Sequence, residues 1–94
     1  MGEKTRSNLY QTLKKKRKEM DLIDQKLLTL LNQRLRIALG IGKIKKGIGK
    51  KIYDPKREKE VSERLKRKNK GPLKEEDLKT IFARIIKACR KCQI

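Results

Sequence analysis

One uninterrupted helical pattern occupies almost half of this chain and constrains its fold more than any other feature. From about residue 6 to residue 45, apolar side chains recur at the three- and four-residue spacing of an α-helix, and no proline interrupts them. Gly40 and Gly42 weaken the pattern near its end, but each costs only about 1 kcal/mol relative to alanine, which a packed helix tolerates. We therefore predict one long first helix, with these apolar positions: Leu9, Leu13, Met20, Ile23, Leu27, Leu30, Leu31, Leu35, Ala38 and Ile41.

The length of this helix predicts a second subunit. At 1.5 Å per residue the helix would extend about 60 Å, whereas a compact globule of 94 residues has a radius of gyration of roughly 12 Å. The rest of the chain supplies only two shorter helical segments, which cannot cover the whole apolar stripe. We therefore expect an intertwined homodimer in which the long helices of two chains pair.

The second helix has clear start and stop signals. Gly47-Ile48-Gly49 indicates a loop over about residues 46–53, and Asp54-Pro55 then supplies an N-cap followed by proline at the first helical position. This helix is predicted over about residues 55–68, because the Asn69 to Pro72 segment ends it with left-handed and proline breaks.

The third helix is predicted over about residues 74–92. No stretch of the chain shows the alternation of a β-strand, so we expect the all-α class. A length of 94 residues corresponds to one domain, so we expect residues 1–94 to form a single domain. The apolar positions of the third helix follow a helical stripe almost to its end: Leu78, Ile81, Phe82, Ile85, Ile86 and Cys89.

The net charge favours an anionic partner. Twenty-nine Lys and Arg against eleven Asp and Glu give +18, which suits nucleic acid, acidic lipid headgroups or small polyanionic metabolites. The run Lys14 to Lys18 is a candidate phosphate-binding helix, but a solvated helix face explains most of these lysines. With only two Tyr and one Phe in the chain, a platform for stacking bases is disfavoured.

Several kinds of chemistry lack the residues that they need. The chain has no His and only two cysteines, Cys89 and Cys92, so one subunit cannot assemble a zinc site from four soft donors, and we expect two reduced thiols. No nucleotide-binding glycine motif is matched, and no histidine can serve as a general base. If the chain is an enzyme, its reaction should therefore depend on positioning and charge rather than on proton transfer. Polar first residues and the lack of a membrane-length apolar run predict a cytoplasmic protein.

Three cations on the long helix are candidate ligands for a small anion. Arg34 and Lys45 are eleven residues apart, which is three turns, so both project from one face with α-carbons about 16 Å apart. Arg17 lies about 25 Å from Arg34 along the axis and roughly 100° around it, so it cannot meet the same ligand within one chain. In an antiparallel dimer it could reach the site of the partner.

The two shorter helices supply further candidates. Asp54 at the N-cap, Arg57 and Glu58 cluster at the start of the second helix, and Cys89 and Gln93 lie one turn apart on the third. Taken singly, each fits ordinary capping or surface ion pairing.

The order of these residues along the chain is more specific than any one of them. The ordered segments are Arg17, Ile23-Asp24, Leu27-Leu28, Leu30-Leu31-Asn32, Arg34, Ile41-Gly42, Ile44-Lys45, Tyr53-Asp54-Pro55, Arg57-Glu58, Asn69, Gly71-Pro72-Leu73, Ile81-Phe82 and Ile85-Ile86. This string, with spacing that fits from about residue 13 to residue 93, resembles the all-helical chorismate mutases.

The resemblance implies a three-helix subunit whose long first helix pairs with its twin, giving two equivalent sites that convert chorismate to prephenate without metal or cofactor. It also implies that Arg34 and the partner subunit's Arg17 bind the two carboxylates of chorismate, with the planar fork that suits such groups. Arg57 would add positive potential.

For the reacting centre, the resemblance implies that Lys45 and Gln93 donate hydrogen bonds to the ether oxygen and that Glu58, near Lys45, holds the ring hydroxyl. Asp54 would line and order the pocket. Many members carry a hydroxyl residue where this chain has Cys89, whose thiol packs and donates only weakly. Two alternatives stay open beside the enzyme: a basic helical dimer that binds nucleic acid, and a catalytically silent mutase-like regulatory module.

Overall fold

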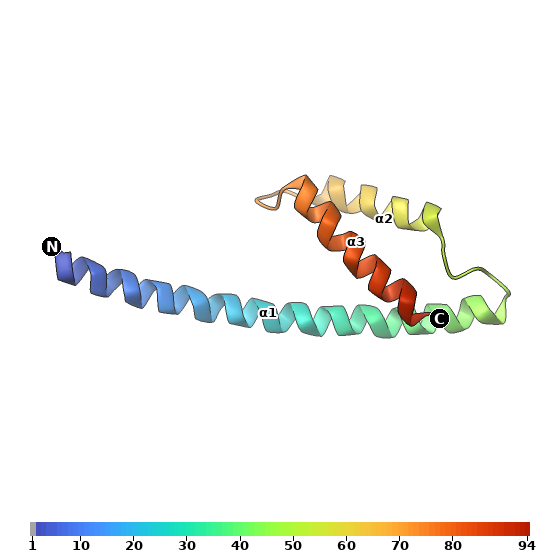
Figure 1. Ribbon diagram of the computed structural model, residues 1–94, viewed down its shortest axis with the longest axis horizontal. Helices are drawn as coiled ribbons and strands as arrows, with labels where there is room; N and C mark the ends of the chain where they lie inside the picture. The colour runs from blue at the N-terminus through green and yellow to red at the C-terminus, as the bar shows by residue number, and fades with distance from the viewer. Residues whose placement is uncertain (1) are drawn as a thin grey trace. The chain divides into compact units, whose positions relative to one another are not determined.

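The computed structural model describes the backbone of residues 2–94 and the side chains from residue 5 onward. It contains three helices in chain order (Figure 1): α1 (Gly2–Gly47), α2 (Pro55–Lys68) and α3 (Glu75–Cys92). Residues 2–94 contain no strand, so the predicted all-α class is confirmed. The chain divides into two compact units, Met1–Asn32 and Gln33–Ile94.

Helix α1 is longer at both ends than the predicted 6–45. It begins at Gly2 and continues through Gly47, because a helix requires suitable backbone angles but no apolar side chain at its ends. The helix ends two residues later than predicted, and the turn after it contains Gly49, whose φ of +69° is one that glycine adopts readily. There the Lys50 N–H donates to the Lys45 carbonyl at 2.7 Å and closes the turn. The connecting loop is consequently 48–54 rather than 46–53.

Helix α2 has the predicted bounds, and its caps explain why. The Asp54 carboxylate accepts a hydrogen bond from the Arg57 N–H at 3.1 Å, which satisfies one of the free donors of the first turn. After Lys68, the Asn69 amide donates to the Leu73 carbonyl at 2.8 Å and accepts from the Gly71 N–H at 3.0 Å. The left-handed residue of this turn is Gly71, with φ +76°. The chain is thereby turned toward α3.

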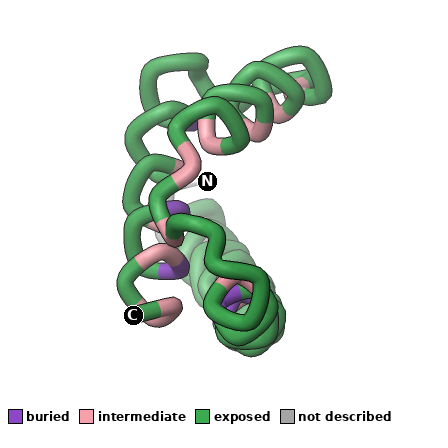
Figure 2. The backbone as a smooth tube through the Cα atoms, turned by 90° about the vertical axis from the view of Figure 1, so that its right-hand side faces the viewer, coloured by how far each residue is buried: buried purple, intermediate pink, exposed green. Residues whose placement is uncertain are grey.

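The core lies in the unit Gln33–Ile94 and is small. Helices α2 and α3 pack against each other, and α3 runs from the end of α2 to the C-terminal part of α1, drawn orange to red in Figure 1. The Cys92 thiol reaches the Leu35 carbonyl of α1 at 3.8 Å. The few described residues with buried apolar side chains are Ala38, Leu78, Ile86 and Cys89. Figure 2 colours the buried positions of the backbone purple.

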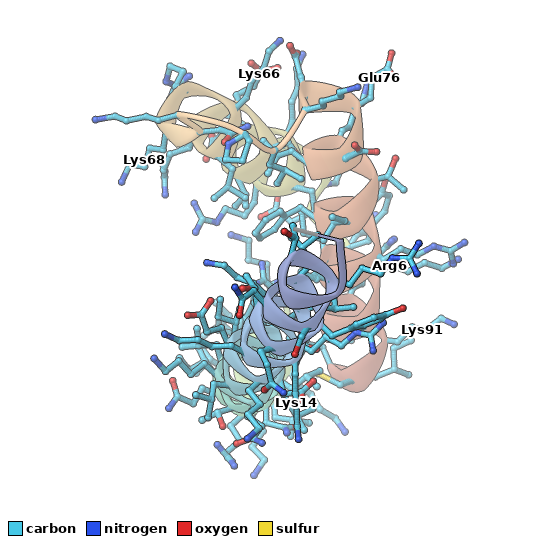
Figure 3. All side chains as sticks on the ribbon, turned by 90° about the vertical axis from the view of Figure 1, so that its left-hand side faces the viewer. Arg6, Lys14, Lys66, Lys68, Glu76 and Lys91 are labelled. Carbon is cyan, nitrogen blue, oxygen red and sulfur yellow. The ribbon has the colours of Figure 1, made fainter. Side chains whose placement is uncertain are left out.

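In the unit Met1–Asn32, residues 2–32 belong to one stretch of helix, and the side chains from Thr5 to Asn32 are all exposed. Large apolar side chains are among them, including Ile23, Leu27 and Leu30, each more than half exposed. In Figure 3 the side chain of Lys14 projects outward from the helix. Apolar and charged groups are therefore exposed together along this part of α1.

Candidate active site

A cavity of about 310 Å³ lies among α1, the loop before α2, α2 and α3 within the unit Gln33–Ile94. This volume is at the lower end of the range for sites that take small molecules. Seven of the eight predicted site residues line it: Arg34, Lys45, Asp54, Arg57, Glu58, Cys89 and Gln93. The structure thus brings seven residues from separate segments of the chain to one cavity, and their roles stay a prediction.

Each helix lines the cavity with residues of one face, most of them three or four positions apart. Each of these faces contains both polar and apolar side chains. The apolar members form much of the wall and exclude water from part of the site. Helix α1 contributes Arg34, Ile37, Ala38, Ile41 and Lys45; α2 with its N-cap contributes Asp54, Arg57, Glu58 and Val61; and α3 with its C-cap contributes Ile86, Cys89, Arg90 and Gln93.

Lys45 is held in place by two acceptors. Its ammonium donates to the Ile52 carbonyl at 2.8 Å and to the Gln93 side-chain oxygen at 3.4 Å. An ammonium has three donors and no acceptor, so one donor is left for a ligand. For the same reason Gln93 must turn its oxygen toward Lys45, which leaves the NH₂ group of its amide to donate elsewhere. The pair is preorganised as a set of hydrogen-bond donors.

Gly42 allows α1 to approach Gln93 closely. It is buried, and a Cβ built on it would lie 2.9 Å from the Cβ of Gln93 and 3.0 Å from its Cα. These distances are shorter than ordinary van der Waals contact, so any side chain at this position would force Gln93 and α1 apart. From the sequence alone, Gly42 is interpreted as a weak position of the helix, and its packing role is visible only in the structure.

Glu58 forms an ion pair with Arg90, a residue that was not among the predicted site residues. Its Oε2 lies 3.4 Å from Nε of Arg90, which also lines the cavity, and both side chains are about one-third exposed or less. Because the chain has 29 Lys and Arg, the presence of an arginine does not by itself indicate a site residue. The position of Arg90 on α3, four residues after Ile86 and three before Gln93, could have placed it on the same face.

The charges of the cavity suit a dianion. Four cations line it, Arg34, Lys45, Arg57 and Arg90, against the two carboxylates of Asp54 and Glu58. Asp54 is engaged as the N-cap of α2 and Glu58 is paired with Arg90. An excess of two positive charges, concentrated in a partly enclosed cavity, attracts a small molecule with two negative groups.

Cys89 is buried in the cavity wall, and its neighbour Cys92 donates its thiol to the Cys89 carbonyl at 3.0 Å. Both cysteines are free. Across the residues that the structure describes, no group of three or more His, Cys, Asp or Glu side chains is placed to hold a metal ion. Within the same residues, no helix combines the length and apolarity required to cross a membrane.

Arg17, the eighth predicted site residue, belongs to the unit Met1–Asn32 and is exposed. The basic run around it, Lys14 to Lys18, is likewise exposed, and Lys16 pairs with Glu19 at 3.4 Å. Because successive residues of a helix are about 100° apart, five consecutive cations encircle the helix and do not form one stripe. This arrangement disfavours the nucleic-acid alternative.

Three helices thus enclose a small cavity with fixed donors and a surplus of positive charge, in an all-helical domain. Residues 16–94 match the family described as type II chorismate mutase, and the chain belongs to this family. The resemblance stated from the sequence is confirmed.

Two of the similar proteins are bifunctional enzymes. The bifunctional chorismate mutase/prephenate dehydratase of Aquifex aeolicus is 43% identical over 81 residues, which is 82% of this chain but 22% of that protein. The corresponding protein of Neisseria gonorrhoeae is 40% identical over 73 residues, which is 78% of this chain and 20% of its own length. The chain therefore spans about a fifth of the curated relatives that it matches.

Two solved structures match over most of both chains. Chorismate mutase form II of Thermus thermophilus is 34% identical with a TM-score of 0.85, covering 87% of this chain and 93% of that one. Chorismate mutase of Helicobacter pylori in complex with prephenate is 39% identical with a TM-score of 0.80, covering 87% of this chain and 89% of that one. The three-helix arrangement is thus that of a chorismate mutase domain.

Proposed function

We propose that this chain rearranges chorismate to prephenate in the cavity between its three helices. The observation that carries the proposal is the gathering of seven predicted residues around one cavity with two surplus positive charges. Chorismate is a dicarboxylate, and its concerted [3,3] rearrangement moves no proton. Catalysis then requires the substrate to be held in a chair-like shape and its polarised transition state to be stabilised.

The arginines of the cavity bind the carboxylates. Arg34 is half-buried on α1 and offers a planar, bidentate fork to one of them. The partner subunit's Arg17 supplies the second fork, and Arg57, exposed at the start of α2, adds positive potential.

Lys45 and Gln93 stabilise the charge that grows on the ether oxygen as the C–O bond breaks. Their mutual hydrogen bond and the anchoring of Lys45 on the Ile52 carbonyl hold the remaining donors in fixed directions. Preorganised donors of this kind are each worth roughly 10²- to 10³-fold in rate. Glu58 accepts a hydrogen bond from the ring hydroxyl, Asp54 orders the cavity as the cap of α2, and Cys89 packs in its wall.

A second copy of the chain completes the site. The apolar side chains along α1 are exposed in the single chain: Leu27 by 51%, Leu30 by 57% and Ile23 by 56%. A helical stripe of this kind is stable in water when another helix covers it. Antiparallel pairing of two α1 helices buries the stripe and brings Arg17 of each chain to the site of the other.

We place the reaction in the cytoplasm, in the synthesis of phenylalanine and tyrosine. The free thiols of Cys89 and Cys92 fit a reducing compartment.

The decisive experiment follows the loss of chorismate absorbance with purified protein and two pairs of variants. Lys45→Ala and Arg34→Ala should each lower kcat/KM by about 100-fold or more. Their controls, Lys43→Ala and Arg36→Ala, remove the same charges from exposed positions of the same helix and should change it little. Equal activity in all four variants, or an inactive wild type, would reject the proposal. Binding of chorismate without turnover would support the silent module.

Sharing of the site between chains is tested by mixing inactive Arg17→Ala and Arg34→Ala subunits. Each mixed dimer contains one complete site and one site that lacks both arginines. Random exchange should therefore restore about a quarter of the wild-type activity. Full exchange, verified by a mass tag, without recovery would contradict the sharing of arginines.

A further inference from the structure

Arg90 contacts two other segments of the site besides its own helix. Its Nε faces the Oε2 of Glu58 on α2 at 3.4 Å, and its Cζ lies 4.7 Å from the centre of the Tyr53 ring, which belongs to the loop before α2. That distance is within the range of a cation–π interaction. The side chain of Arg90 is 31% exposed and that of Glu58 is 27% exposed, so water weakens this pair less than a surface pair.

Three further cations share the cavity with Glu58. Arg34, Lys45 and Arg57 line the same cavity, and a flexible carboxylate would turn toward whichever of them offers the strongest attraction. Such a pairing would cancel one of the charges that the two carboxylates of the substrate require. It would also move the carboxylate away from any neutral group that it has to bind.

We propose that Arg90 is the positioning residue of Glu58: it holds this carboxylate in one place and keeps it from neutralising the cations that bind the substrate. The inference rests on the proposed function, since it concerns the reaction that this cavity catalyses. A carboxylate has two oxygens, so the pairing of Oε2 with Arg90 leaves Oε1 to accept from the ring hydroxyl.

The contact with Tyr53 gives the guanidinium of Arg90 a second point of attachment. With the guanidinium over this ring, its Nε is the atom that faces Glu58. Lysine in this position would keep the charge but lose the rigid, planar group whose Nε faces Glu58.

The inference is tested by a double-mutant cycle on chorismate turnover with Glu58→Gln and Arg90→Gln. Each single variant should lower kcat/KM, and Arg90→Gln should do so by roughly 2- to 150-fold, the usual range of coupling between contacting residues. If Arg90 acts through Glu58, adding Arg90→Gln to the Glu58→Gln variant should change kcat and KM little. Arg90→Lys should recover part of the loss, and thermal melts should show that all variants fold.

The matched control is Lys87→Gln, which removes one charge from an exposed position of the same helix and should leave turnover unchanged. If Arg90→Gln raises KM by the same factor with and without Glu58, Arg90 binds the substrate directly and the inference is overturned. An unaffected Arg90→Gln variant overturns it as well. A wild-type protein that does not turn over chorismate rejects the proposed function itself, a result distinct from either of these.

Discussion

Replacing Gly42 by alanine tests whether the close approach of α1 and Gln93 sets the catalytic geometry. The added methyl would meet the Cβ of Gln93 at 2.9 Å, its Cα at 3.0 Å and its Cγ at 3.1 Å. Ordinary contact begins at 3.4 Å, so these atoms must move apart by about half an ångström. Because one of them is a backbone atom, a change of side-chain rotamer cannot remove the clash.

The displacement should affect activity more than stability. Alanine in place of glycine favours the helix by about 1 kcal/mol, whereas overpacking of a core contact costs about 1–3 kcal/mol, so the net loss of stability is about 0–2 kcal/mol. Misplacement of a catalytic group by 1 Å can cost about 10²-fold in rate. We therefore expect kcat to fall by about 10- to 100-fold, with a smaller change in KM because Arg34 is untouched.

Gly40 provides the matched control. It lies in the same helix two residues earlier, and a Cβ built there has nothing within 4 Å. Gly40→Ala should therefore raise the free energy of unfolding by about 1 kcal/mol and leave kcat unchanged. Steady-state turnover of chorismate and urea unfolding of both variants provide the measurements. If Gly42→Ala is as active as Gly40→Ala, the approach of Gln93 to α1 does not control its placement, and the reasoning is refuted.

Three further predictions concern the stability of the domain. Asp54→Ala removes the cap of α2 and should lower the free energy of unfolding by about 1 kcal/mol in a urea titration. Ile86→Ala empties a buried position and should cost about 2–5 kcal/mol, clearly more than Ile81→Ala, where the side chain is 48% exposed. A hydrogen bond from Lys66 to the Glu75 carboxylate raises the pKa of this lysine. Its contribution is therefore complete below pH 10.5 and lost as pH rises through the raised pKa, and Glu75→Gln should abolish that alkaline loss in melts.

Local chemistry made the helices predictable from the sequence to different degrees. Both bounds of α2 follow from groups that act within a few residues: the Asp54 cap, the proline after it, and the Asn69 and Gly71 turn. The ends of α1 have no such signal, because the periodic apolar residues that revealed the helix are not needed in its first and last turns. The predicted bounds were too short there for that reason.

Seven residues that line the cavity could be named from the sequence because each has a fixed spacing on its own helix and a fixed order along the chain. What spacing cannot give is the partner of a side chain on another helix. Lys45 and Gln93 are 48 residues apart, and the angle and distance at which their helices meet determine whether they touch. The same holds for Glu58 and Arg90, whose pairing depends on how α2 packs on α3.

The contact at Gly42 explains why these interhelical pairs form one site. A residue without a side chain lets Gln93 approach α1, and this approach allows its amide oxygen to accept from Lys45. Lys45, anchored also on the Ile52 carbonyl, in turn holds the loop that carries Tyr53, and Tyr53 supports Arg90 beside Glu58. Gly42, which weakens the helix when the sequence is considered alone, thus allows the contacts that order two polar pairs of the proposed site. These pairs are Lys45 with Gln93 and Glu58 with Arg90.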